Sequence, residues 1–285
     1  MLNLNTKLTV LHDDNSTFED HSDKAHSYVR DSFVFDYTTS EDALYIGYSK
    51  PINVFYTELE EVNAIDASLT IQYYKGGTTN AFTSISSVID DTEGLTRSGF
   101  IQWPRDLEDE EETTVNGTEQ YWYKLTWDAT LSGSTEIKGI NIVFSDDQDL
   151  KSRVPNISAT KYLADGEKSH ILSHVAARDE ILQRLSNDGR FKANFLTGVL
   201  SELNQFDILN VNQLRNASKM YALYVIFDDL SDDPDDRYGV RASQFISSFN
   251  QIYNNIRFLD IDVDDDGKSD QYEEMASSSS ELKRR

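Results

Sequence analysis

The sequence contains no cysteine, which excludes disulfide bonds, thiolate catalysis and cysteine-ligated zinc. It also lacks an unbroken apolar run of about 18 residues, the length that a membrane-crossing helix needs. The first residues, MLNLNTKLTVLHDDNS, have neither the basic region nor the apolar core of a secretory signal. We therefore expect a soluble protein that is made and assembled in a cytoplasm.

Basic residues are scarce: 26 lysines and arginines stand against 50 aspartates and glutamates, for a formal net charge of −24. Proteins that bind nucleic acids through phosphates need clustered lysine and arginine, and anionic membrane surfaces attract the same residues. The composition therefore argues against sequence-specific nucleic-acid binding and against a membrane partner.

The chain has 285 residues, of which 38% are hydrophobic and 11% aromatic, which is enough for two domains with their own cores. Between about residues 31 and 146 the apolar residues alternate with polar ones and polar turns separate the runs, as in antiparallel sheets. This pattern predicts a β-sandwich or jelly-roll-like domain over 31–150. The expected strands are ALYIGY (43–48), INVFYTEL (52–59), SLTIQYYK (68–75), GFIQW (99–103), YWYKLTWD (121–128) and EIKGINIVF (136–144). Residues 1–30 are polar and aperiodic, and we interpret them as an extended N-terminal arm.

After a linker at 151–165 the apolar period becomes that of a helix, which predicts a helical bundle over 166–259. One helix is expected over 167–185, with Ile171, Leu172, Val175, Leu182 and Leu185 on one side. A second begins near Asn210, a suitable N-cap, and a third is opened by Asp235 and Asp236. The third helix has apolar residues at steps of four and three, so it packs along other helices. They are Tyr238, Ala242, Phe245, Phe249, Ile252 and Ile256. The fold class is α+β with two domains.

Residues 260–285 form an acidic loop and a polar tail, and DIDVDDDGKSDQYEE (260–274) matches the calcium loop of an EF-hand. The template places carboxylates at positions 1, 3, 5, 9 and 12, a glycine at 6 and a backbone carbonyl at 7. Here the predicted ligands are Asp262, Asp264, Asp266, Lys268 through its carbonyl, Asp270 and Glu273. The competing interpretation is a solvated acidic tail.

A calcium sensor needs an amphipathic helix after the loop and usually a second, paired loop. The chain after Glu273 is EMASSSSELKRR, which has almost nothing to bury. If Ca²⁺ binds, we expect a structural role.

His170 and His174 are spaced to share a metal ion, but no acidic residue at fixed spacing accompanies them, and we expect histidines on a helix surface. No P-loop, GxGxxG or nucleophile-elbow motif is found, and we expect no enzymatic activity. Trp103, Trp122 and Trp127 leave an alternative open, because tryptophans on a sandwich can stack on sugar rings. The alternative is a calcium-stabilised carbohydrate-binding or adhesion protein.

Stretches such as SKMYALYVIFDDL and DALYIGYSKPINVFYTEL resemble virion proteins from the head–tail neck of tailed bacteriophages. The segment from SKMYALYVIFDDL through DRYGVRASQFISSFNQIYNNIRF to DVDDDGKSDQYEE resembles their helical connector (adaptor) part. DALYIGYSKPINVFYTEL, TRSGFIQWPRD and QYWYKLTWD with IKGINIVFSDD resemble the β-domain of the same group. The resemblance covers about residues 40–150 and 165–274.

The resemblance implies a non-enzymatic protein that forms a homo-oligomeric ring between portal and tail in the virion, after assembly in the host cytoplasm. Its partners would be other copies of itself, the portal protein, and tail or other neck proteins. The acidity of the chain would repel DNA that passes through such a ring rather than grip it.

Overall fold

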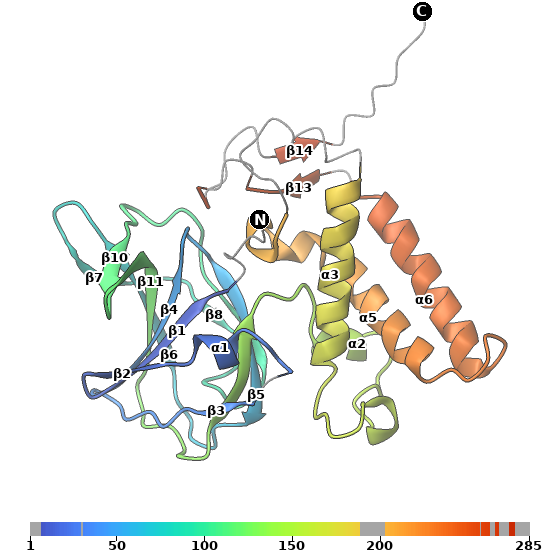
Figure 1. Cartoon of the computed structure of the whole chain (residues 1–285), viewed down its shortest axis with the longest axis horizontal. Coiled ribbons are helices and arrows are strands. Elements are labelled where there is room, and N and C mark those ends of the chain that lie inside the picture. The colour runs from blue at the N-terminus through green and yellow to red at the C-terminus, as the bar shows by residue number, and fades with distance from the viewer. Residues whose placement is uncertain are drawn as a thin grey trace, which may run out of the picture. The chain divides into compact units, whose positions relative to one another are not determined.

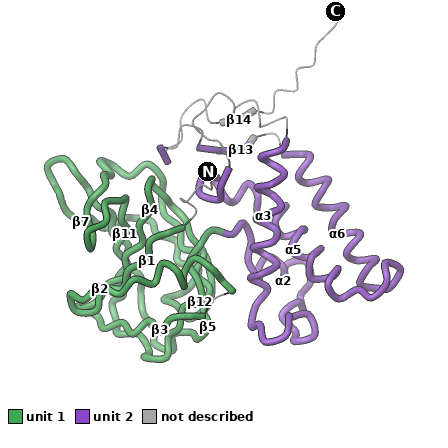
Figure 2. Tube along the Cα trace, viewed as in Figure 1, with its two compact units in different colours: residues 1–142 green, residues 143–285 purple. Residues whose placement is uncertain are grey.

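The computed structural model describes residues 7–29, 31–188, 203–256, 258–262, 266–267 and 274–276. It is an α+β protein with antiparallel sheets, as expected. The chain divides into two compact units, Met1–Ile142 and Val143–Arg285 (Figure 2). Unit 1 holds the two large sheets, and unit 2 holds the long helices (Figure 1).

The larger sheet of unit 1 has seven strands in the order β2-β1-β4-β11-β6-β7, with β10 paired to β11. Its strands are β1 (Thr9–Asp14), β2 (Thr17–Asp20), β4 (Ala43–Tyr48), β6 (Leu69–Lys75), β7 (Ala81–Ser84), β10 (Thr113–Val115) and β11 (Thr118–Trp127). Residues 9–20, which we expected to form an arm, are therefore part of the sheet. β1 pairs with β4 over five residues. The sequence of residues 9–20 alone does not indicate this pairing.

The second sheet has five strands in the order β3-β12-β5-β9-β8. They are β3 (Phe33–Val34), β5 (Val54–Glu61), β8 (Ile89–Asp90), β9 (Gly99–Gln102) and β12 (Glu136–Asn141). A short helix, α1 (Ser22–Ala25), precedes β3. Each of the six expected strands corresponds to a strand of one of the two sheets.

Aromatic side chains from both sheets meet in the core of unit 1. Trp103, just after β9, lies 4.8 Å from Tyr123 of β11 between ring centroids. Tyr37 packs edge-on against Trp127 at 5.1 Å, and its hydroxyl donates to the Trp127 carbonyl and accepts from the Trp127 amide, both at 2.8 Å. Burial raises the pKa of Tyr37, so the hydroxyl stays protonated.

The opposite face of the larger sheet has its own apolar cluster around Trp122. This ring lies over Gly47 of β4, where an added Cβ would stand 2.7 Å from the ring carbons. A side chain at residue 47 would displace the tryptophan, so the packing requires glycine there. Phe18 of β2 and Phe82 of β7 cover the same cluster.

Unit 2 contains the helices α2 (Asp147–Lys151), α3 (Ile171–Asn187), α5 (Arg215–Asp229) and α6 (Arg237–Asn254). Short 3-10 turns lie at Thr160–Tyr162, Gln205–Asp207 and Val211–Gln213, and β13 (Phe258–Asp260) pairs with β14 (Glu274–Ala276). α5 packs against both α3 and α6. Asp236 caps α6 by accepting hydrogen bonds from the amides of Tyr238 and Gly239 at 2.6 and 2.7 Å, which confirms the predicted start.

Near the C-terminal end of α6, the buried residues differ from those that the expected spacing predicts. Ala242, Phe245 and Phe249 are buried as predicted, but the next buried residue is Tyr253, while Ile252 is half-buried. Phe245 contacts Phe227 of α5 at 5.3 Å, and Phe249 contacts Tyr221 of α5 at 5.0 Å. This side of α6 is thus occupied within the chain.

Candidate functional site

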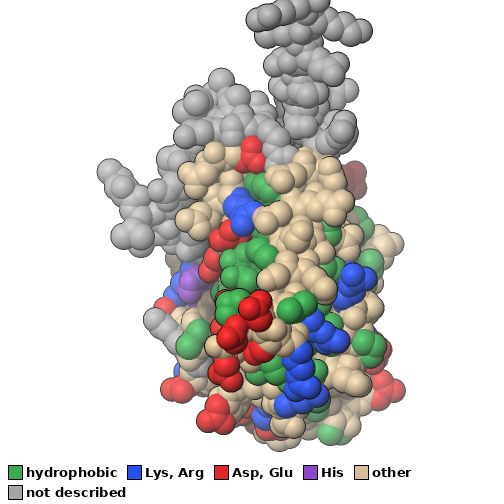
Figure 3. All heavy atoms as spheres, turned by 90° about the vertical axis from the view of Figure 1, so that its right-hand side faces the viewer, with side chains coloured by type: hydrophobic (Ala, Val, Ile, Leu, Met, Phe, Trp, Pro, Cys, Tyr) green, Lys and Arg blue, Asp and Glu red, His purple; other side chains and the backbone are tan. Residues whose placement is uncertain are grey.

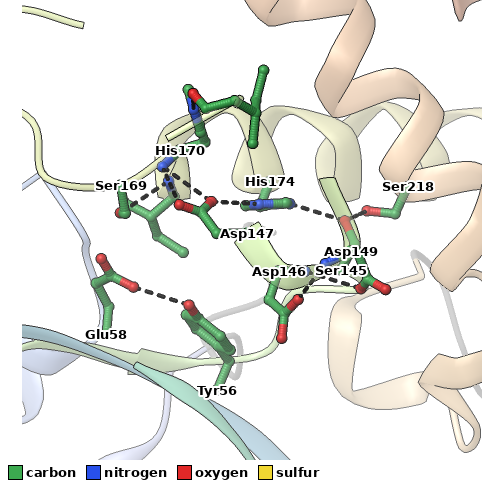
Figure 4. Close-up of polar contacts among 12 residues, drawn as sticks. Tyr56, Glu58, Ser145, Asp146, Asp147, Asp149, Ser169, His170, His174 and Ser218 are labelled. Atoms are coloured by element: carbon green, nitrogen blue, oxygen red, sulfur yellow. Dashed lines mark hydrogen bonds and ion pairs between the residues drawn. The ribbon is translucent and has the colours of Figure 1, made fainter. Parts of the chain in front are cut away.

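A chain of buried polar groups joins three segments of unit 2 (Figure 4). His174 of α3 lies between Asp147, the first residue of α2, and Ser145 just before it. The His174 Nε2 atom is 3.2 Å from Asp147 Oδ1, and its Nδ1 atom is 2.9 Å from Ser145 Oγ. Ser145 Oγ is in turn 2.7 Å from the hydroxyl of Ser218 on α5. The chain therefore connects α2, α3 and α5.

His170, one turn before His174, is tied to the same aspartate. Its backbone amide donates to the two Asp147 carboxylate oxygens at 3.2 and 3.4 Å, and its ring Nε2 lies 3.0 Å from the carbonyl of Ile157. Both histidines are buried, with His174 only 1% exposed. The expectation of surface histidines is therefore wrong. A histidine whose two ring nitrogens are both hydrogen-bonded, as those of His174 are, can be buried without binding a metal ion.

The buried side of α3 therefore differs only in part from the one that its apolar residues indicated. His174 and Ala177 point into unit 2, whereas Leu172 is exposed. Ile171, Leu182 and Leu185 are buried as predicted.

The electrostatics of this network favour an ionised Asp147. Burial raises the pKa of the Asp147 carboxyl, but the hydrogen bond and charge of His174, together with His170, outweigh burial, so the pKa lies below its ordinary value. Burial lowers the pKa of His170 and thus favours its neutral ring. In contrast to Asp147, burial raises the pKa of the Asp146 carboxyl above its ordinary value.

Ser145, His174 and Asp147 are hydrogen-bonded in the order of a hydrolase catalytic triad. The serine hydroxyl is nevertheless not placed to attack a substrate. Ser145, His174 and Ser218 are all buried, and the Ser145 hydroxyl contacts Ser218 rather than an open cleft. A nucleophile must reach the substrate, and its base must face the same space. The network therefore holds three segments together.

A second set of contacts fixes α2 against α5. Asp146 and Asp149 form a capping box at the start of α2, with Asp149 N donating to Asp146 Oδ1 at 2.9 Å. Arg215, the first residue of α5, donates from Nε to both carboxylate oxygens of Asp149 at 2.8 and 2.7 Å. This charged contact links the start of α5 to the first turn of α2.

Of the predicted calcium ligands, Asp262 and Asp266 lie within the described residues, whereas Asp264, Lys268, Asp270 and Glu273 lie outside them. Asp262 is buried, and its two carboxylate oxygens accept from the amides of Asp266 and Gly267 at 3.1 and 2.9 Å. Gly267 has a φ of +73°, the left-handed conformation that glycine adopts without strain. A calcium loop needs the same sharp turn at its sixth position.

The base of this loop is fastened to the chain before α5. The amide of Asp262 donates to the carbonyl of Asp207 at 2.8 Å, and the amide of Leu209 donates to the carbonyl of Asp260 at 3.0 Å. Gln213 makes two further bonds to Asp260, one to its amide and one to its carboxylate. The loop is closed by β13 and β14, so a strand and not a helix follows Glu273, and a strand separates the loop from α6.

The three tryptophans that suggested sugar binding are all buried. Trp103, Trp122 and Trp127 lie in the two cores of unit 1 described above. A sugar-binding tryptophan must offer one ring face to solvent, so the observation that favoured the carbohydrate-binding alternative does not hold.

Comparison with models of known protein families finds no match for this chain. No curated protein matches it at a significant level. None of the helices in the described ranges combines the length and the apolar character needed to cross a bilayer.

Proposed function

We propose that this chain is a structural virion protein of a tailed bacteriophage, a head–tail adaptor that forms a ring between portal and tail. It acts by binding neighbours and has no enzymatic role. The proposal places it in the virion neck, after assembly in the host cytoplasm.

The observation that carries the proposal is the correspondence between the resembling stretches and the elements of the fold. The stretches that resemble the neck β-domain coincide with β4, β5, β9, β11 and β12 of two antiparallel sheets. The stretch that resembles the helical connector part coincides with α5, α6 and the loop after them. The order along the chain, with the strands of the antiparallel sheets first and the long helices after them, agrees with the order of the resembling stretches.

The surface of the chain is consistent with a role in assembly. Figure 3 shows hydrophobic side chains exposed on one face among groups of acidic and basic side chains. Because the apolar side of α6 packs against α5, subunit contacts would use exposed residues of this kind and not the buried side of the helix. The net charge of −24 keeps such a ring from binding DNA that passes through it.

The acidic loop is proposed to bind Ca²⁺ as a structural ion in an EF-hand-like loop. Asp262, Asp266 and the turn at Gly267 fit the first half of the template, and the sequence supplies the remaining oxygen ligands. When bound, Ca²⁺ would neutralise the clustered carboxylates. Since the strand β14 follows the loop, the ion would fix the β13–β14 hairpin instead of moving a helix.

The test is to produce phage particles without this chain. We expect DNA-filled or leaking heads without attached tails, because the ring that joins them is missing, and free tails in the same lysate. Supplying the wild-type chain in trans should restore tailed particles. Tailed particles of normal appearance and number in the absence of the chain would overturn the proposal.

A further inference from the structure

Three potential metal ligands, His12, Glu19 and His21, lie close together at the β1–β2 hairpin of unit 1, and Figure 1 shows where this hairpin lies in the unit. His12 of β1 stands directly opposite Glu19 of β2 in the strand register. His21 follows the end of β2, and its amide donates to the carbonyl of Val10 at 2.9 Å. Backbone hydrogen bonds thus hold all three residues at one edge of the larger sheet.

The distances among these side chains suit a single ion. One ring nitrogen of each histidine and one carboxylate oxygen of Glu19 all lie within 4.8 Å of one another. His21 Nε2 is 3.5 Å from Glu19 Oε2. Zinc ligands about 2.1 Å from the ion in tetrahedral geometry stand about 3.4 Å apart, so this pair already has the required spacing.

The histidines lack the hydrogen bonds that buried imidazoles normally make. His12 is 4% exposed, and the Nε2 atoms of both His12 and His21 are buried without a hydrogen-bond partner. Buried polar atoms are nearly always paired, and an unpaired one is costly unless an ion or water satisfies it. Two buried ring nitrogens without a hydrogen bond, in histidines that lie with one carboxylate in a single cluster, are an independent indication of a bound ligand.

The surroundings divide into an apolar wall and an open side. The His21 ring stacks on Phe33 with centroids 4.2 Å apart, and the His12 ring meets Phe35 edge-on at 4.9 Å. These contacts fix the ring planes. The Glu19 side chain is 59% exposed, whereas that of His21 is 12% exposed. An ion can therefore enter from the Glu19 side, where a water molecule can complete its coordination.

We propose that His12, Glu19 and His21 bind a divalent transition-metal ion, with Zn²⁺ as the most suitable. Two imidazole nitrogens and one carboxylate oxygen are a donor set for zinc and its neighbours, whereas Ca²⁺ and Mg²⁺ take oxygen ligands. The ion would fasten the edge hairpin to the turn that leads into α1. This site is independent of the proposed function and of the acidic loop.

The test is calorimetric titration of the full chain with Zn²⁺ after removal of metals by a chelator, with several millimolar Ca²⁺ present to occupy the acidic loop. We expect one saturable zinc site in the wild type. Glu19→Gln should weaken binding at least tenfold by removing the carboxylate, and His21→Phe should abolish it while keeping the stack on Phe33. The matched controls Glu41→Gln, at an exposed turn, and His26→Gln, a histidine outside the cluster, should bind like the wild type.

The visible absorption of bound Co²⁺ is a second measurement, which reports on the metal ligands and not on whether the chain is folded. Co²⁺ bound by two histidines and a carboxylate at low coordination number has visible absorption bands, which we expect for the wild type and not for His21→Phe. Far-ultraviolet circular dichroism should show both variants folded, because Glu19 is exposed and phenylalanine preserves the ring contact. The proposal is overturned if the wild type has no saturable site, or if Glu19→Gln and His21→Phe bind zinc as tightly as the wild type.

Discussion

Two clusters of histidines with a carboxylate occur in this protein, and they differ in how their nitrogens are paired. In unit 2, His174 places one nitrogen on Asp147 and the other on Ser145. In unit 1, His12 and His21 each have a buried Nε2 atom without a hydrogen-bond partner. The same residue types thus form a closed structural network in one place and an incomplete ligand set in the other. The pairing of each nitrogen separates the two roles, whereas the residue types do not.

The largest effect should come from breaking the closed network. Asp147→Ala leaves His174 Nε2 and the His170 amide without their acceptor, so we expect a loss of about 3 kcal/mol in the free energy of unfolding. Urea denaturation measures it. Asp165→Asn, an exposed substitution in the same unit, is the control and should change stability by less than about 0.5 kcal/mol. A variant Asp147→Ala as stable as this control would show that the network contributes nothing.

The acidic loop provides a test of whether the two metal proposals are separate. Ca²⁺ that binds only the folded chain stabilises it by about 2.7 kcal/mol at a hundredfold excess over Kd, and we expect a Kd on the order of 10⁻⁴ M or above. Thermal denaturation with and without millimolar Ca²⁺ measures the shift. Glu273→Gln should remove most of it, while Glu274→Gln, just outside the template, should retain it.

Glu19→Gln should likewise leave the calcium shift intact. If Glu273→Gln keeps the full shift, the loop is a solvated acidic segment. A large calcium-induced increase in the binding of a hydrophobic dye would indicate a switch instead of a structural ion.

Acidification should weaken the closed network through two groups. His170 and Asp147 both have pKa values lowered in the folded protein, so the unfolded chain binds their protons more readily. The stability that results from the lowered pKa of His170 is fully present above about pH 6.5 and is lost as the pH falls through the folded pKa of this residue. The stability that results from the lowered pKa of Asp147 is fully present above about pH 3.9 and is lost as the pH falls through the folded pKa of that carboxyl. Each unit by which folding lowers a pKa corresponds to about 1.4 kcal/mol in the free energy of unfolding.

Urea denaturation at pH 7 and pH 5 separates the histidine part. The wild type should lose more stability over this range than His170→Gln, which cannot take up that proton. Equal losses in the two proteins would mean that the His170 pKa is the same in the folded and unfolded chain.

The smallest effect is expected in the incomplete cluster. Without metal, His21→Phe removes a buried nitrogen that has no partner and preserves the stack on Phe33, so stability should change by less than about 1 kcal/mol, or increase. With Zn²⁺ the wild type should gain stability and the variant should not. A loss of several kcal/mol in the presence of chelator would show that His21 is structural in the way that His174 is.

Local patterns in the sequence were sufficient for much of the fold. The strand at 43–48 was predicted with its observed bounds, because polar turns flank it and its residues favour strands. The start of α6 could be predicted because the first backbone amides of a helix lack partners within the helix, and an aspartate just before them can accept their hydrogen bonds.

Features that depend on distant residues were missed. β1 joins the larger sheet through β4, whose paired residues lie 30 to 38 positions later in the chain, and its own sequence is polar enough to resemble an arm. The burial of His174 depends on Asp147 and Ser145, which lie more than 25 residues before it and give no signal in the sequence around the histidine. The spacing of His170 and His174 was the one available indication, and only the structure shows which groups their nitrogens meet.

The central claim is that this chain forms the joint between head and tail, and its position in the virion tests that claim most directly. Particles would be assembled with a chain that carries a small affinity tag at its N-terminus, labelled with gold and imaged by electron microscopy. We predict one cluster of label per particle, at the junction of capsid and tail, and tagged particles with normal tails. Label on the capsid surface, along the tail or at the distal tip, or purified tailed particles without any label, would contradict the account.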